Sequence, residues 1–193
     1  ALKAIGKHLE KQVKAYLIGG CAMSLLGLKP STKDVDLVLA DSISEQMLFH
    51  ALKKAGFEEL FPGSSEVPLK AKDILIDENG LQFDLFTKQV MGGLNLSSGM
   101  KKRAKAYVNY GNLEVLLASK EDIYLFKAVT DRPFPRDFED LLTLQQASVD
   151  WKMVIVEYEK QVKGTKLEAN LRKKMLELKK NGIVNPLQKQ VLS

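Results

Sequence analysis

Three aspartates stand in apolar runs where a strand would ordinarily carry apolar side chains. Asp34 and Asp36 alternate with apolar residues in DVDLVL, and Asp84 lies within LQFDLF. Because successive side chains of a strand point to opposite faces, Asp34 and Asp36 share a face and lie about 7 Å apart. Carboxylates this close repel one another unless a cation joins them, and Mg²⁺ prefers such oxygen ligands. The aspartates therefore predict a magnesium site, although each alone also fits a solvated strand.

A pair of glycines, Gly19-Gly20, joins a short apolar strand at residues 16–18 to a segment with helical spacing. Glycine lets the backbone approach an anion closely, and the first N–H groups of a helix have no intrahelical partner. The pair therefore predicts a phosphate cradle, although an ordinary strand–helix turn has the same residues. The sequence has no G-x-G-x-x-G fingerprint and no Walker A lysine, which argues against dinucleotide-binding and P-loop folds.

The order of these features resembles the polymerase β-like nucleotidyltransferase superfamily. Its pattern is hG[GS], a spacer, a DhDh strand and a third carboxylate, and here thirteen residues separate Gly20 from Asp34. The resemblance covers residues 16–86, and the run that starts at Gly19 is similar to minimal and antibiotic-type members. It implies an α/β (α+β) fold, with a mixed sheet flanked by helices and followed by a helical C-terminal region.

The resemblance also implies a reaction, the transfer of a nucleoside monophosphate from an NTP to an acceptor hydroxyl. Asp34 and Asp36 would hold two Mg²⁺ ions, and Asp84 would complete the metal site on the acceptor side. Gly19 and Gly20 would hold the triphosphate. Many members have serine at position 20, so this chain would offer backbone N–H groups there, with the Thr32 hydroxyl as a candidate donor or simply a strand-entry residue.

A further stretch is similar to the helical motifs of abortive-infection toxin nucleotidyltransferases. It comprises Lys127 and the run Arg136-Asp137-Phe138-Glu139-Asp140. By this resemblance Lys127 would contact triphosphate oxygens, and Asp137 or Asp140 would support the site. Lysines and aspartates are also common on solvated helices. A toxin that acts on tRNA and has a paired antitoxin is one subclass of the predicted enzyme.

The composition of the chain gives weaker limits on its partners than the motifs do. The formal net charge of +5 favours anionic partners such as a triphosphate or RNA, and a solvated lysine-rich surface would give the same charge. No run approaches the roughly 20 apolar residues of a membrane span, and the one cysteine, Cys21, fits a reducing cytoplasm. No histidine stands near Cys21 in the sequence to activate it as a nucleophile. We therefore expect a cytoplasmic protein without membrane contact.

The acceptor is left open, because RNA, protein and small-molecule acceptors use the same core. A homo-oligomer is an equally open expectation. The main alternative to an enzyme is a catalytically inactive nucleotidyltransferase-fold module that binds a nucleotide or a partner.

The pattern of elements divides the chain into an α/β core at 1–118 and a helical C-terminal region at 119–193. Apolar spacing predicts a first helix that reaches Val13, and Ser42 with Glu45 predicts a helix start with a capping box. Strands 74–76 and 81–86, and strands 106–110 and 113–117, form two predicted hairpins. Residues 92–100 are predicted to be a mobile loop, and the residues after 180 an ill-defined tail.

Overall fold

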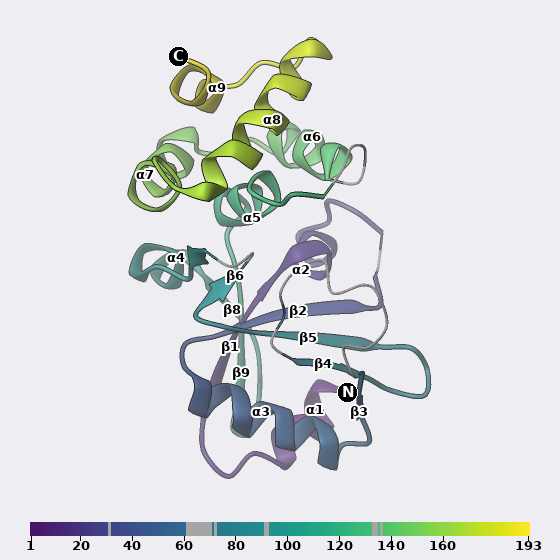
Figure 1. The fold of residues 1–193 in the computed structure, drawn as a ribbon. Coiled ribbons are helices and arrows are strands. Elements are labelled where there is room, and N and C mark those ends of the chain that lie inside the picture. The colour runs from purple at the N-terminus through teal and green to yellow at the C-terminus, as the bar shows by residue number, and fades with distance from the viewer. Residues whose placement is uncertain (31, 61–70, 72, 91–92, 133–134, 136) are drawn as a thin grey trace. The chain divides into compact units, whose positions relative to one another are not determined.

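The computed structural model describes residues 1–193 except 31, 61–70, 72, 91–92, 133–134 and 136. Contacts between residues divide the chain into two compact units, Ala1–Ser119 and Lys120–Ser193, and each is described by itself. The first holds the β-sheets and the second is helical (Figure 1). This α/β architecture with a helical C-terminal region confirms the predicted fold class, while the division into domains at 1–118 and 119–193 stays a prediction.

A seven-stranded mixed sheet forms the centre of the first unit, in the order β3-β4-β5-β2-β1-β9-β8. The pairs β1–β9 and β2–β5 are parallel and the other neighbours are antiparallel. Both predicted hairpins are confirmed, as β4–β5 and as β8–β9. The strands are β1 (Val13–Ile18), β2 (Asp34–Leu39), β3 (Glu58–Glu59), β4 (Asp73–Ile76), β5 (Gln82–Thr87), β8 (Lys105–Tyr110) and β9 (Leu113–Leu117).

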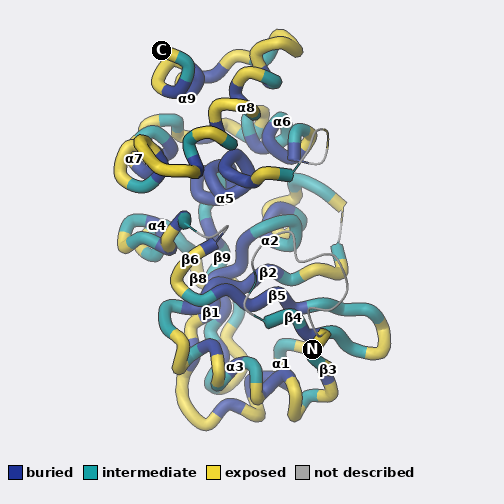
Figure 2. The backbone as a smooth tube through the Cα atoms, viewed as in Figure 1, coloured by how far each residue is buried: buried dark blue, intermediate teal, exposed yellow. Residues whose placement is uncertain are grey.

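The central strands β1, β2 and β5 are buried along most of their length (Figure 2). Helix α3 (Ser42–Lys54) packs on these strands, helix α2 (Gly19–Leu25) packs on β1 and β2, and α1 (Leu2–Lys7) contacts α3. A strand covered on both faces has apolar residues at consecutive positions, as in the Leu37-Val38-Leu39 end of β2. Against this background, aspartates inside β2 and β5 are exceptional.

Two predictions about helix ends are wrong. Helix α1 ends at Lys7, and Val13 instead begins β1, where it pairs with Leu113 of β9. The prediction from apolar spacing was wrong here because a buried strand and one face of a helix can both present apolar residues at these spacings. Helix α3 is capped by Asp41, whose Oδ1 accepts from the Ser44 backbone N–H at 2.7 Å, so the cap lies one residue before Ser42.

Residues 93–100 were expected in a loop, but most of them form regular structure. Strand β7 (Leu94–Asn95) pairs with β6 (Gln89–Val90), and helix α4 (Ser98–Arg103) follows. The Ser97 hydroxyl accepts from the Met100 backbone N–H at 3.1 Å, which satisfies an N-terminal donor of α4. Serine, interpreted as a loop former, is here the N-cap of a helix.

The second unit contains α5 (Lys120–Ala128), α6 (Phe138–Gln146), α7 (Trp151–Gln161), α8 (Lys166–Lys180) and α9 (Pro186–Val191). Helix α5 is buried throughout and contacts α6, α7 and α8 (Figure 2). The tail is not ill-defined, because Asn185 and Gln188 form a capping box at the start of α9. No helix in the described ranges has the length and apolar character needed to cross a membrane.

Candidate active site

Asp36 lies at the centre of the candidate site because of the strand register. It pairs with Asp84 on the parallel strand β5 and with Ile18, the last residue of β1, on the other side. Directly opposed residues of neighbouring strands point to the same face, so the Asp36 and Asp84 side chains are adjacent. They are only 8% and 7% exposed. The sheet therefore gathers two buried carboxylates beside the end of β1.

Gly19 makes this arrangement possible at the start of α2. Its φ is +67°, in the left-handed region that favours glycine, and a Cβ at this position would lie 2.0 Å from Asp36 Oδ2. The Asp36 carboxylate therefore occupies the space of a missing side chain. The predicted link between the glycine turn and the acidic strand is thus a direct steric contact in the structure.

Asp34 and Thr32 lie at the entrance of β2, away from the buried pair. Asp34 is exposed and pairs with Gln82, and its backbone N–H donates to the Thr32 hydroxyl at 3.2 Å. Gln82, which the sequence did not single out, donates from Nε2 to Asp84 Oδ1 at 2.7 Å. This bond fixes the orientation of one of the two central carboxylates.

Gly20 differs from Gly19 because it has room for a side chain. Among the described residues, a Cβ there would meet Lys29 Nζ and Thr32 Cγ2, each at 3.8 Å, which is an ordinary contact distance. Lys29 is a second residue that the sequence did not single out. Its ammonium group lies over the backbone of the predicted phosphate cradle.

Cys21 follows the glycine pair and is half-buried. Burial raises the pKa of its thiol, and the nearby charge of Asp36 raises that pKa further. A raised pKa disfavours the thiolate, which is the nucleophilic form. The structure therefore supports the expectation that Cys21 is not a nucleophile.

Whether the candidate site suits Mg²⁺ depends on which side-chain oxygens it offers as ligands. Within the described ranges, no three His, Cys, Asp or Glu side chains are placed to hold a metal ion together. Mg²⁺, however, is commonly bound by one or two carboxylates, with substrate phosphates and water as the other ligands. Asp36 and Asp84 match that pattern, and Asp34 lies two residues from Asp36 along the same strand. The donor set therefore fits a metal that arrives with a nucleotide.

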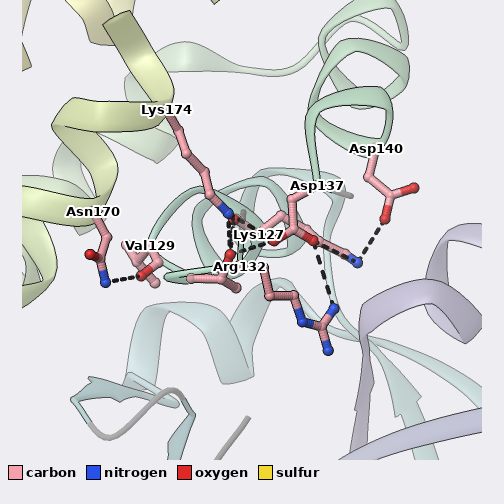
Figure 3. Close-up of polar contacts among 8 residues, drawn as sticks. Lys127, Val129, Arg132, Asp137, Asp140, Asn170 and Lys174 are labelled. Atoms are coloured by element: carbon pink, nitrogen blue, oxygen red, sulfur yellow. Dashed lines mark hydrogen bonds and ion pairs between the residues drawn. The ribbon is translucent and has the colours of Figure 1, made fainter. Parts of the chain in front are cut away.

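The predicted residues of the helical unit form a cluster within that unit (Figure 3). Lys127 Nζ lies 2.7 Å from Asp140 Oδ2 and 3.6 Å from Asp137 Oδ1, so the structure does bring these three residues together. All three are buried. Their proposed role at a triphosphate stays a prediction, since here they form ion pairs with one another.

Asp137 is the centre of this charged cluster. Lys174 Nζ donates to Asp137 Oδ2 at 2.8 Å, Thr130 donates to the same oxygen, and Arg132 Nη1 lies 3.7 Å from Oδ1. Burial works to raise the pKa of Asp137, but Lys174, Thr130 and Lys127 together hold it below its usual value. Burial lowers the pKa of Lys174, against the opposing effect of Asp137. The cluster is thus a set of mutually neutralising charges.

A cavity of about 320 Å³ adjoins this cluster within the helical unit. Its wall includes Arg132, Lys173 and Lys174, together with Asp131 and Glu177. Cations and carboxylates are both present, so the charges give no clear preference for an anion.

Comparison with solved structures gives similarities to nucleotidyltransferases. The antibiotic-resistance factor ANT(2'')-Ia matches with 15% identity and a TM-score of 0.48, over 88% of both chains. The lincomycin-bound lincosamide antibiotic adenylyltransferase LnuA matches with 17% identity and a TM-score of 0.45, over 70% of this chain and 88% of that one. An antigenic nucleotidyltransferase-like protein from Paracoccidioides brasiliensis has 21% identity and a TM-score of 0.45, over 86% of this chain and 82% of that one.

No family model and no curated protein matches the sequence. These solved structures are of an antibiotic-resistance factor, an adenylyltransferase and a nucleotidyltransferase-like protein. Because their TM-scores lie below 0.5, the case for a function rests on the residues of this chain.

Proposed function

We propose that the chain is a Mg²⁺-dependent nucleotidyltransferase, which moves a nucleoside monophosphate from an NTP to an acceptor hydroxyl. The observation that carries this proposal is the register of Asp36 with Asp84, next to a glycine turn that excludes a side chain. Adjacent buried carboxylates are costly unless cations compensate their charge. An NTP–magnesium complex would supply the cation for the carboxylates and phosphates for the backbone N–H groups of the turn.

Asp36 and Asp84 would hold the metal, with Asp34 contributing from the strand entrance. Bound there, Mg²⁺ supplies charge stabilisation to the phosphoryl group and its leaving oxygens. Gly19 brings the turn within contact of the Asp36 carboxylate, so the triphosphate and the carboxylates can share one site. Helix α2 has only seven residues, which makes the backbone N–H groups of the turn more important than the helix dipole.

Asp84 is the residue we assign to the acceptor hydroxyl. A group that accepts a proton must be held in a defined orientation, and the Gln82 hydrogen bond to Oδ1 does this. Asp84 would lower the pKa of the acceptor hydroxyl or accept its proton. The acceptor belongs to RNA, a protein or a small molecule, since the core serves all three classes.

Thermal unfolding tests the nucleotide site directly. Mg²⁺ with an NTP should raise the melting temperature, because a ligand that binds only the folded state stabilises it. The Asp34→Ala, Asp36→Ala double variant should lose this shift. Glu78→Ala, which removes an exposed acid from the β4–β5 turn, should keep it. Absence of a shift in the unmodified protein with each of the four common NTPs would refute the proposal.

Transfer is tested separately from binding. Incubation with labelled NTPs and bulk RNA should give labelled product, and nucleotide binding without transfer to RNA, protein or small-molecule hydroxyls would favour the inactive module. A tRNA-directed toxin makes a further prediction for living cells. Expression should arrest growth and Asp36→Ala should relieve the arrest, whereas harmless expression would count against that subclass.

A further inference from the structure

The loop after α2 is joined by hydrogen bonds to the last turn of that helix. The Leu28 backbone N–H donates to the Met23 carbonyl oxygen at 2.9 Å, and the Ser24 hydroxyl donates to the Pro30 carbonyl oxygen at 2.5 Å. Lys29 lies between these two attachment points. Pro30 also restricts the backbone of the preceding residue to extended conformations. The position of Lys29 is therefore defined by contacts on both sides.

This loop places the Lys29 ammonium beside Gly20. Nζ lies 3.8 Å from the position that a Cβ on Gly20 would occupy, with the Thr32 methyl group at the same distance. An oxygen atom of a ligand in that space would be within reach of both the Gly20 backbone and Lys29 Nζ. The neighbouring residue Gly19 contacts Asp36, so the ammonium group borders the proposed metal site.

Electrostatics favours a phosphate as the ligand of Lys29. A triphosphate bears several negative charges, and Asp36 and Asp84 add more of the same sign. A lysine ammonium is a compact point charge that binds phosphate strongly through charge-assisted hydrogen bonds. We propose that Lys29 binds the β- and γ-phosphates of the NTP and supplies the side-chain donor that Gly20 lacks. This inference rests on the proposed function.

Nucleotide affinity tests the inference without any need for turnover. Calorimetric titration of the full chain with Mg²⁺ and a triphosphate whose α–β bridge cannot be cleaved gives one dissociation constant, and the nucleoside monophosphate gives another. Lys29→Met should weaken triphosphate binding roughly 10- to 100-fold, the loss of one charge-assisted contact, and change monophosphate binding less than about twofold. Lys29→Arg should retain most of the affinity.

Lys33→Met is the matched control, because Lys33 lies four residues away and donates from Nζ to the Asn79 carbonyl oxygen at 2.9 Å. It should leave both constants unchanged. Gly20→Ser in the Lys29→Met background should recover part of the triphosphate affinity, since a side chain fits at this position. This recovery would also show that the Lys29→Met protein is folded.

The possible failures are distinguishable. Unchanged triphosphate affinity in Lys29→Met would overturn the role of Lys29 and leave the proposed function intact. An equal loss for triphosphate and monophosphate would also overturn it, since Lys29 would then only support the fold of the loop. Lack of triphosphate binding by the unmodified protein would refute the proposed function and this inference with it.

Discussion

The two units of the chain hold buried charges in opposite ways. In the β-sheet unit, Asp36 and Asp84 place charges of the same sign next to each other. In the helical unit, Asp137 and Asp140 are each paired with lysine, within a network that includes Arg132. Buried carboxylates that are paired stabilise a fold only modestly, but breaking such a pair is costly. Removing one of two adjacent charges of the same sign should cost the fold less than removing the charge at the centre of an ion-pair network.

This contrast separates two adjacent carboxylates of the sheet from a network of ion pairs among the helices. The sequence singled out aspartates in both units and a lysine in one. Residue type alone could not show which aspartates lie beside another carboxylate and which form ion pairs. If the contrast is correct, substitutions in the sheet unit will affect binding and transfer first. Substitutions in the helical cluster will affect stability first.

The largest expected effect belongs to Asp36→Asn. Transfer should fall about 1,000-fold, because in the proposed function this residue would hold the metal that stabilises the reacting phosphate. The melting temperature without ligand should be unchanged or higher, since like-charge repulsion is relieved. Pyrophosphate release and thermal unfolding measure the two quantities. A large loss of stability would contradict the assignment of Asp36 to a ligand site.

Asp137→Asn should produce the opposite result. It leaves Lys174 without its buried counter-charge and removes one of the two carboxylates beside Lys127, so it should lower the free energy of unfolding by about 3 kcal/mol. Urea unfolding can be followed by the fluorescence of Trp151, the single tryptophan, whose ring packs at 5.0 Å on Tyr124. Glu139→Gln, at an exposed position of the same helix, should change stability little.

Acid should weaken the same cluster in the unmodified protein. The folded pKa of Asp137 lies below its unfolded value, so the residue contributes its full stability above about pH 4. That contribution is lost as the pH falls through the depressed folded pKa. Unfolding free energies measured from pH 6 to pH 2 should therefore decline less steeply in Asp137→Asn. Parallel pH curves for the two proteins would show that the ion pairs contribute nothing.

Gly19→Ala and Gly27→Ala form a matched pair with a smaller effect. Both glycines have a positive φ, +67° and +72°, so alanine adds about 1 kcal/mol of backbone strain at either position. At Gly19 the new Cβ would meet Asp36, whereas no atom of the described residues lies within 4 Å at Gly27. Gly19→Ala should therefore lose Mg²⁺–NTP binding and roughly 2 kcal/mol of stability, by thermal unfolding. If both variants lost the same amount of nucleotide binding and stability, the contact between Gly19 and Asp36 would have no special role.

The smallest expected effect concerns Cys21. Asp36→Asn removes a charge that raises the pKa of the thiol, so more thiolate forms at pH 8. Alkylation by iodoacetamide should become roughly two- to threefold faster, and Cys21 is the only cysteine that can react. Asp34→Asn should not change the rate. A rate unaffected by Asp36→Asn would mean that Asp36 does not act electrostatically on this end of the turn.

Local sequence patterns predicted the elements that carry the site. The strand at Asp34–Leu39, the glycine turn and the hairpin that contains Asp84 all form where the patterns placed them. Cap positions and short elements were harder, as Asp41 and the helix at Ser98–Arg103 show. A single polar residue can begin a helix or occupy a loop, and tertiary packing decides between them.

The sequence by itself determined that Asp34 and Asp36 alternate along one strand and that Gly19 and Gly20 end another, because side-chain period and glycine conformation are local properties. Only the tertiary structure decided that Asp84 lies opposite Asp36, since strand order and register depend on pairing between distant segments. It also decided that Lys29 rather than Lys33 lies at the turn. Two lysines of the same loop are equivalent in the sequence, and only the path of the backbone separates them.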